Sequence, residues 1–498
     1  MLQKLDAPSR TSDSPLYKVC EYCVKKNCDF GTAYAHLRPH LYGIISNGQV
    51  SDNMKALEDD KKMRQNLLIN KQITNGTAPP RRVWDLVSNR VVPWWVARKF
   101  PWAISHAWVD NKDLKREITS INGYKWPVPM PKYADLGLIR IEMLNLGAEY
   151  VWLDVLCLRQ ERKDGDPLGN ASKKKEALRK KEWKVDLPTI GWIYHKAKNV
   201  VCYFSGLGRP QSFKPGDFES NRCWFNRAWT LQETRDDLLV AGKTCELMTE
   251  DMRKLFDEKL ASLRQMHRED SILDILSQMQ QRKSTNLGDK VAGLVYLFYS
   301  QYIPIYDADQ SEEDAWTKLV NITQIWILGM CTLFFCYPGP GNGNNIWHPS
   351  WKQLMAENLS GLMLSLPLNR YDRRSVWVDR MKGDGDYYFG PRIDSCRVRG
   401  LSDESTLETP RHGKLNIIDR SGEKHTFEIV ANHAFSMPDD LYTLIGFFYP
   451  PYFSVAVIGK IEGPDIKFRK VSVINIGDRE AATIRSLDVI EVTETYLL

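Results

Sequence analysis

The chain has 498 residues, enough for two to four domains, and 43% of them are hydrophobic, which excludes a disordered or fibrous protein. Its 68 basic and 62 acidic residues leave a formal net charge of +6, too even a balance for binding nucleic acid through bulk charge. Tryptophan is frequent, with 16 residues, and eleven of them lie between Trp84 and Trp229. We therefore expect one region of the chain to use large aromatic rings.

The start of the chain is polar and interrupted by proline, which does not fit a signal peptide. The longest apolar run, Ile325 to Tyr337, has thirteen residues, fewer than the roughly twenty that a membrane-spanning helix needs. The ten cysteines are mostly isolated along the chain, which is typical of a reducing compartment. We expect a cytoplasmic protein without a membrane span.

Residues 1–80 are polar and mixed, and we interpret them as an N-terminal extension. Two cysteines and two histidines have the spacing of a zinc finger: Cys20, Cys23, His36 and His40. A finger is not expected, because Pro39 should break the helix that carries the histidines. Cys28 offers a third thiolate, so a zinc site of another kind, on Cys20, Cys23, Cys28 and His36, stays open.

Short apolar runs alternate with amphipathic stretches over residues 83–245. Four runs have the length and composition of strands: 102–105, 150–154, 199–205 and 238–241. Apolar residues recur every three or four positions over 136–146 and 190–197, which predicts helices. Strands that alternate with helices predict an α/β domain with a mainly parallel sheet.

Two further regions follow the α/β region. Residues 250–390 are mostly amphipathic, and we expect helices at 251–282 and 311–333. Residues 395–498 show period-two strands separated by turns, typical of an all-β sandwich or barrel.

Polar side chains follow three of the predicted strands. Ser105 and His106, with Trp108 close behind, end the first strand, Asp154 ends the second, and Ser205 follows the third. Ligands of a parallel α/β sheet bind beyond the carboxyl ends of its strands, so we expect these residues to share a crevice.

A fourth polar element is the string from Asn226 to Glu233. If it forms a helix, Trp229 and Glu233 stand four residues apart on one face. An aromatic ring one turn from a carboxylate suits a planar base or sugar beside a group that stabilises positive charge. The alternative is that Trp229 packs the helix and Glu233 is solvated.

Four strings in this region, taken in order, resemble the heterokaryon-incompatibility (HET) domain of filamentous fungi. They are Ala103-Ile-Ser-His-Ala-Trp108, Tyr150-Val-Trp-Leu-Asp-Val-Leu-Cys-Leu-Arg-Gln160, Ile190-Gly-Trp-Ile-Tyr-His-Lys-Ala197 and Arg227-Ala-Trp-Thr-Leu-Gln-Glu233. The string Arg282-Lys-Ser-Thr-Asn-Leu-Gly-Asp-Lys290 resembles the segment that often follows that domain. The resemblance implies an effector of fungal non-self recognition and programmed cell death, with 83–245 as the HET domain.

The HET domain is in turn similar to the TIR domain, a flavodoxin-like α/β module of innate immunity in which some members cleave NAD+. Those members carry a catalytic glutamate four residues after a tryptophan, and Trp229 and Glu233 have this spacing. The resemblance implies that Glu233 is catalytic, with Trp229 beside it. It places NAD+, as a substrate rather than a bound cofactor, among Ser105, His106, Trp108 and Asp154.

A non-enzymatic signalling module is the alternative function, acting by self-association of the HET domain. In either case we expect a homo-oligomer formed through that domain, an unidentified trigger protein and no nucleic acid partner. The basic run Lys173 to Lys184 is interpreted as a solvated helix, with Glu176 paired to Lys180 four residues on.

Overall fold

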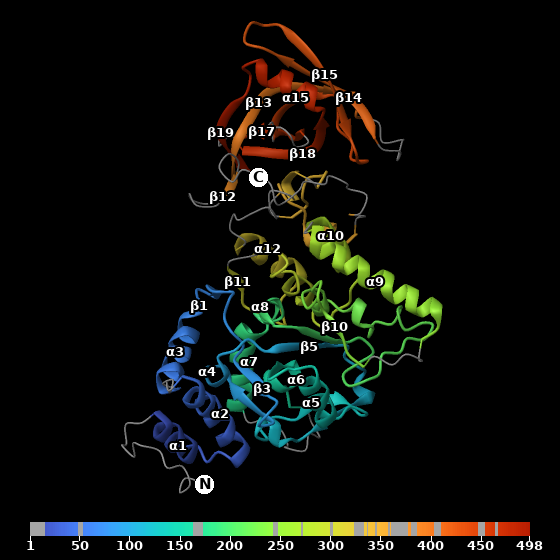
Figure 1. The fold of residues 1–498 in the computed structure, drawn as a ribbon. Coiled ribbons are helices and arrows are strands. Elements are labelled where there is room, and N and C mark those ends of the chain that lie inside the picture. Colours follow the sequence, from blue (N-terminus) through green and yellow to red (C-terminus); the bar gives the residue numbers. More distant parts are fainter. Residues whose placement is uncertain are drawn as a thin grey trace. The chain divides into compact units, whose positions relative to one another are not determined.

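The computed structural model of the chain (Figure 1) describes the following residues: 15–47, 53–162, 173–242, 248–269, 272–298, 302–322, 333–335, 337–343, 346–356, 359, 377–379, 386–402, 410–446, 454–463 and 467–498. The chain forms two compact units. The first comprises 1–265, 282–297 and 301–310, and the second comprises 266–281, 298–300 and 311–498. Each unit is described by itself. The division of the sequence into four regions stays a prediction.

The first unit is built on a six-stranded sheet. In spatial order its strands are β10 (Leu239–Val240), β9 (Val200–Tyr203), β5 (Trp102–His106), β8 (Tyr150–Trp152), β3 (Arg82–Asp85) and β4 (Arg90–Pro93). The first four strands are parallel, whereas β3 pairs antiparallel with both β8 and β4. The four predicted strands are therefore confirmed, and the β3–β4 hairpin extends their sheet.

Helices connect the parallel strands, as the apolar spacing predicts. The helices between β5 and β9 are α5 (Leu136–Asn145), α6 (Asp154–Cys157), α7 (Lys173–Asp186) and α8 (Ile190–Lys196). Asp135 caps α5 by accepting hydrogen bonds from the backbone of Gly137 and Leu138. Tyr194 of α8 donates a hydrogen bond of 3.0 Å to the carbonyl of Ile104 and so fixes α8 to β5. The α/β prediction for this region is confirmed.

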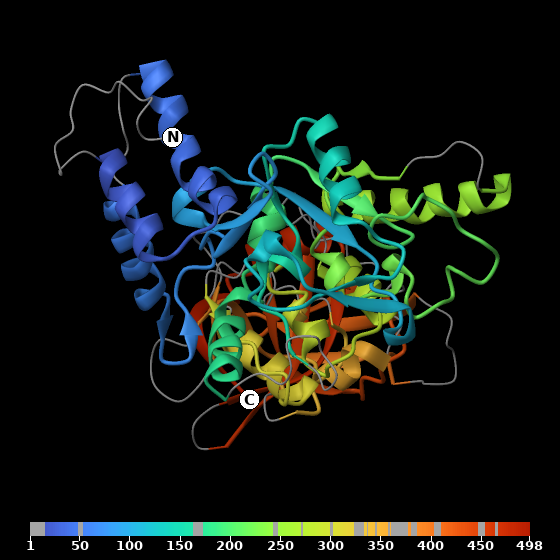
Figure 2. The same cartoon turned by 90° about the horizontal axis from the view of Figure 1, so that it is seen from below.

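Three helices precede this sheet, and their bounds are α1 (Pro15–Lys25), α2 (Phe30–Asn47) and α3 (Asn53–Asn66). They lie together in blue in Figure 2, and α2 contacts β4. The helix α2 runs through Pro39, so the prediction that proline breaks it is wrong. Tertiary contacts offset the lost backbone hydrogen bond: buried Arg38 pairs with Asp85 at 2.8 Å and with Glu149 at 2.7 Å.

Smaller elements complete the first unit. They are β1 (Leu68–Ile69), β2 (Gln72–Ile73), α4 (Trp94–Ala97), η2 (Asn111–Asp113), β6 (Leu114–Glu117), η3 (Ser120–Asn122), β7 (Val128–Pro131), η4 (Trp224–Asn226), η5 (Trp229–Leu231), α11 (Asp289–Ala292) and β11 (Ile303–Pro304). The predicted helix over 251–282 is two helices, α9 (Glu250–Glu269) and α10 (Ile272–Gln280). Between β9 and β10 the structure has the short 3-10 turns η4 and η5 rather than a long helix.

The second unit holds α10, α12 (Glu312–Ile322) and α14 (Trp351–Ala356) together with a β domain. The indole of Trp316 donates to the carbonyl of Pro349 at 3.0 Å and packs against Trp351. The predicted helix over 311–333 is described only as far as α12. The apolar run Ile325 to Tyr337 lies mostly outside the described residues.

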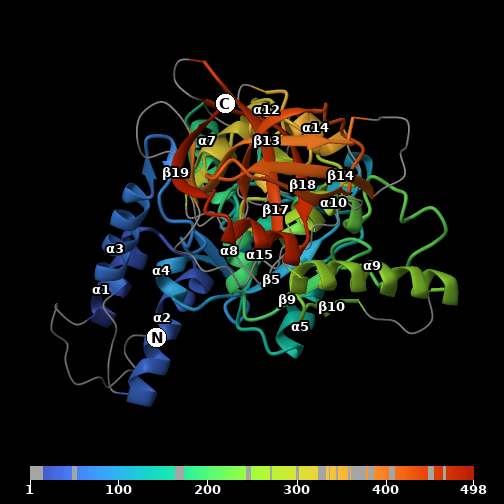
Figure 3. The ribbon, with the colours of Figure 1, turned by 90° about the horizontal axis from the view of Figure 1, so that it is seen from above.

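The C-terminal strands pair in a closed ring. They are β13 (Tyr387–Arg399), β14 (Arg411–Ile418), β15 (Lys424–Ala431), β18 (Lys467–Ile476), β17 (Ser454–Glu462) and β16 (Asp440–Gly446), which returns to β13 (Figure 3). Additional strands β12 (Trp377–Asp379) and β19 (Glu491–Leu497) pair with β13, and α15 (Asp478–Ser486) follows β18. Inward side chains such as Val398, Leu415 and Ile458 form one core. The predicted all-β region is confirmed as a small barrel.

Four tryptophans of the first unit are fully buried: Trp84, Trp126, Trp152 and Trp224. Much of the local excess of tryptophan therefore serves the core of the α/β unit. In the part of the chain that the structure describes, no helix has the length and apolar content for a bilayer span.

Candidate functional site

The carboxyl ends of β5 and β8 bring four of the predicted site residues together. His106 is the last residue of β5, and Asp154 begins α6 immediately after β8. The Nε2 atom of His106 lies 2.9 Å from one Asp154 oxygen, and the indole of Trp108 donates to the other at 3.2 Å. Ser105, next to His106, is fully buried. The predicted crevice residues of the first two strands are thus neighbours.

Glu233 reaches the same strand end from a distant part of the chain. The hydroxyl of Ser105 donates a hydrogen bond to the Glu233 carboxylate, and the indole Nε1 of Trp224 donates to the Ser105 oxygen at 2.7 Å. Trp224 is completely buried and Glu233 is 9% exposed. An indole, a hydroxyl and a carboxylate therefore form one continuous buried chain.

The segment from Asn226 to Glu233 is not the expected helix, because it contains the end of the 3-10 turn η4 and all of η5, and Glu233 lies in the turn that follows η5. Side-chain hydrogen bonds hold this segment, some local and some from the distant Arg282. The Thr230 hydroxyl donates to the carbonyls of Trp224 and Arg227, and Arg282 donates to Arg227 O and Thr230 Oγ1, each at 2.7 Å. The carbonyls of Trp224 and Arg227 thus accept hydrogen bonds from side chains. The chain turns at Thr230, and Glu233 reaches the end of β5.

Burial controls the protonation of Glu233. Removal from water raises its pKa to about 7, and the nearby Asp154 carboxylate also raises it. The hydrogen bond from Ser105, together with His106 and Arg227, opposes this shift. Near neutral pH the side chain thus exchanges readily between its acid and carboxylate forms.

His106 and Asp154 shift the pKa of each other. Burial alone would lower the pKa of His106, but the Asp154 carboxylate outweighs it and the pKa is raised. Burial likewise acts to raise the pKa of Asp154, and His106 with the Val155 backbone and Trp108 lowers it instead. Each partner therefore favours the charged form of the other, and Asp154, with its side chain 22% exposed, is the half-buried member of the pair.

Trp229 is not part of the hydrogen-bonded cluster. It is half-buried, and its ring lies 6.1 Å from that of Tyr306. Ser205, at the end of the third strand, exchanges hydrogen bonds with the backbone of Ser212. The ring that the structure places at Glu233 and Ser105 is Trp224.

Sequence reasoning missed three groups of the site. Tyr194 stands within the string 190–197, and Trp224 stands just before the string 227–233. The Glu233 carboxylate raises the pKa of buried Tyr194 further than burial alone does. Arg282 is 1% exposed, and burial lowers its pKa while Glu233 partly restores it. The signal for Arg282 was its position at the start of the string 282–290, but its partners are 52 and 55 residues away.

Within the described ranges of the chain, Cys20, Cys23, Cys28 and His36 do not form a group of three whose ligand atoms lie within 4.8 Å of one another, although Cys23 interacts directly with Cys28. Cys20, Cys23 and Cys28 are free thiols, and burial, followed by the charge of Cys28, raises the pKa of Cys23 to about 12. Among the described residues, the group whose ligand atoms lie within 4.8 Å of one another is Asp419, Glu423 and His425. Its Asp419 carboxylate is engaged by Ser421, by the Glu423 backbone and by His425 in the β14–β15 turn.

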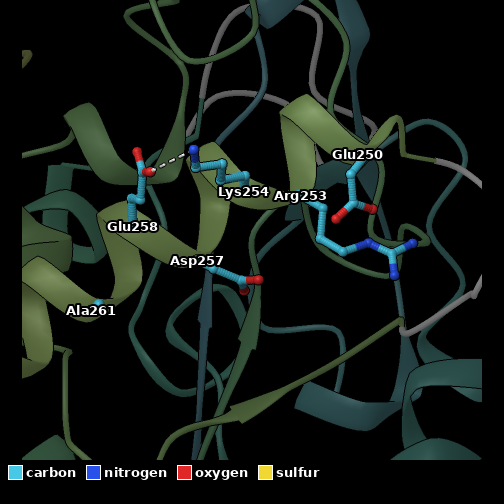
Figure 4. Close-up of a pocket in the computed structure, with 6 residues that line it drawn as sticks. All are labelled: Glu250, Arg253, Lys254, Asp257, Glu258 and Ala261. Atoms are coloured by element: carbon cyan, nitrogen blue, oxygen red, sulfur yellow. Dashed lines mark ion pairs between the residues drawn. The ribbon is translucent and has the colours of Figure 1, made fainter.

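A surface hollow of about 470 Å³ lies along α9, away from these residues in the sequence. Figure 4 shows its lining side chains: Glu250, Arg253, Lys254, Asp257, Glu258 and Ala261. All belong to one helix, and Lys254 pairs loosely with Glu258 at 4.0 Å. This is the solvated flank of a helix, with no convergent polar groups from a second element among the lining residues.

Comparisons with protein-family models, with curated proteins and with solved structures find no match to this chain.

Proposed function

We propose that residues 83–245 of the first unit are a TIR-like HET domain that cleaves NAD+ at Glu233, and that this activity triggers programmed cell death in fungal non-self recognition. The observation that carries the proposal is the hydrogen bond from Ser105, at the carboxyl end of β5, to Glu233. It supports a carboxylate held at the strand end where an α/β sheet binds its ligand.

The strand order supports this reading. Numbered along the chain, the parallel strands β5, β8, β9 and β10 have the spatial order 2-1-3-4, the order of flavodoxin-like sheets. In such sheets the ligand binds where strand order reverses, between the first and third strands. Here those strands are β5 and β9, and Ser105 pairs in register with Cys202 of β9.

The chemistry follows from the charges. Cleavage of the bond between nicotinamide and ribose passes through an oxocarbenium-like state, and a carboxylate beneath the ribose stabilises the developing positive charge. Glu233 supplies this carboxylate when ionised. Asp154 is fixed by His106 and Trp108, and its half-buried oxygens suit hydroxyl groups of the ribose. Nicotinamide leaves with the electron pair of the broken bond, and water then adds to the ribosyl cation and releases a proton to solvent.

A non-enzymatic signalling module is the second candidate, and one observation favours it. Glu233 is 9% exposed and its carboxylate is already hydrogen-bonded by Ser105, so the substrate needs the 224–233 segment to move. A module that acts by self-association needs no such opening.

An assay for nicotinamide release separates the two candidates. The full chain is incubated with NAD+ over a range of protein concentrations, in parallel with Glu233→Gln and with Glu161→Gln, an exposed acid outside the cluster. The enzyme proposal expects release by the wild type and by Glu161→Gln, with at least a hundredfold loss in Glu233→Gln. No release at any concentration, combined with self-association by light scattering, would leave the signalling module as the function.

A further inference from the structure

The helix α7 separates its charges between two faces. It contains six lysines and one arginine against three acidic residues. The three acids are all in ion pairs with arginines: Glu176 with Arg179, Glu182 with Arg82 and Arg159, and Asp186 with Arg81. Glu182 and Asp186 are buried. The expected pairing of Glu176 with Lys180 is replaced by one with Arg179, which lies three residues on and is itself buried.

The anchoring of α7 determines which side faces water. Glu182 accepts hydrogen bonds from Arg82, the first residue of β3, and from Arg159, which follows α6. The indole of Trp183 donates to the Arg159 carbonyl at 2.7 Å. Arg179 lies over the Trp183 ring. Because these contacts fix the inward face of α7, the opposite face carries its exposed residues. The helix is labelled in Figures 1 and 3.

The outward face of α7 is made almost entirely of lysine. Its lysines are Lys173, Lys174, Lys180, Lys181 and Lys184, all exposed, and we name this set the lysine face. Helical spacing of three, four and seven residues puts them on neighbouring positions around Ala177 and Leu178. Leu178 is 42% exposed. Within the described helix the three acids are those paired above, so the lysine face itself carries no carboxylate.

This arrangement concentrates positive charge on the lysine face, although the net charge of the whole chain is small. The net charge of the chain is only +6, yet the acids of α7 are neutralised by arginines and its lysines point outward. The resulting field attracts an anionic surface. Lysines are compact point charges on flexible stems, and an exposed leucine among them can enter the boundary between headgroups and acyl chains.

We propose that the lysine face of α7 docks on an anionic lipid surface. A lipid surface fits better than nucleic acid because the face has no arginine to pair bidentately with backbone phosphates and no aromatic ring to stack on bases: Arg179 and Trp183 face inward. Polybasic helix faces are attracted to phosphatidylserine-rich membranes in this way. The docking is independent of any reaction at Glu233.

The test is sedimentation of the full chain with vesicles of phosphatidylcholine alone and with 30% phosphatidylserine. The variant is Lys180→Glu with Lys181→Glu. The matched control is Lys61→Glu with Lys62→Glu, an exposed lysine pair on α3 that follows three acids and makes the same change in net charge. We expect wild type and control to bind the anionic vesicles at least tenfold more tightly than neutral ones, and the α7 variant to lose at least tenfold. Binding should disappear in 0.5 M salt.

Three results would overturn the proposal. They are equal binding to neutral and anionic vesicles, an equal loss in the α3 control, and tight binding of duplex DNA or RNA through the same lysines without binding to vesicles. Thermal unfolding of both variants should stay close to that of wild type, since the replaced side chains are exposed and the pair of Lys61 with Glu58 lies on the surface.

Discussion

Ser105 and Glu233, 128 residues apart in the chain, meet at the end of β5, where the serine hydroxyl donates to the glutamate carboxylate. The indole of Trp224 donates to the same serine at 2.7 Å. This relationship ties a 3-10 turn to the central strand of the sheet. It also means that the pKa of the buried Glu233 carboxyl group depends on folding.

The stability of the protein should depend on the protonation of Glu233. Burial raises its pKa from 4.5 to about 7 in the folded chain, so the folded state binds the proton more tightly. The stabilisation is present in full below pH 4.5 and is lost as pH rises through 7, on the order of 3 kcal/mol in total. Urea unfolding of wild type and Glu233→Gln at pH 4.5, 6 and 7.5 measures it. Parallel pH dependences in the two proteins would show that Glu233 is not perturbed.

Replacing the indole that donates to Ser105 should destabilise the site. Trp224→Phe keeps most of the buried ring but removes the donor, and we expect a loss of about 1–2 kcal/mol. The matched control is Trp229→Phe, in which a half-buried ring outside the cluster loses the same group. Chemical unfolding should show a change of less than about 0.5 kcal/mol for this control. A larger effect at Trp229 would contradict the assignment of Trp224 as the ring that contacts the site.

The sequence predicts the strand ends well and the turn poorly. Ser105 and Asp154 could be located because apolar runs end at them, a local signal. The conformation of Trp229 to Glu233 could not, because Arg282, 52 residues beyond Thr230, donates hydrogen bonds to Thr230 and to the Arg227 carbonyl and so holds the turn. The helix through Pro39 is similar: Arg38 is held by Asp85, and no local rule reports such a partner.

Breaking the buried ion pair of α2 should be costly. Arg38→Met leaves the Asp85 carboxylate without its charged partner, and both side chains are nearly inaccessible. A loss of about 3–5 kcal/mol is expected. As a comparison, Lys61→Met removes a surface pair with Glu58 and should cost less than about 1 kcal/mol. If both variants unfold at similar urea concentrations, Arg38 does not anchor α2 to the sheet.

A methyl group on Gly191 of α8 should disturb the segment that carries Glu233. A Cβ there would lie 2.5 Å from the Gln232 side-chain oxygen and 2.5 Å from the Tyr296 ring, so one of them must shift. We expect Gly191→Ala to cost about 1–3 kcal/mol. The control Gly288→Ala, where the nearest atom is at 3.6 Å, should be nearly neutral. Equal stability of the two variants in thermal unfolding would contradict this close packing.

The most direct test of the central claim is the pH dependence of nicotinamide release from NAD+. If the ionised Glu233 carboxylate stabilises the transition state, the rate should rise about tenfold per pH unit below its pKa and level off above about pH 7. Glu233→Gln should show at least a hundredfold lower rate than wild type above pH 7, and its rate should lack this rise with pH. A Glu233→Gln variant that retains the wild-type rate, or a wild-type protein that releases no nicotinamide between pH 5 and 9, would contradict NAD+ cleavage at this site.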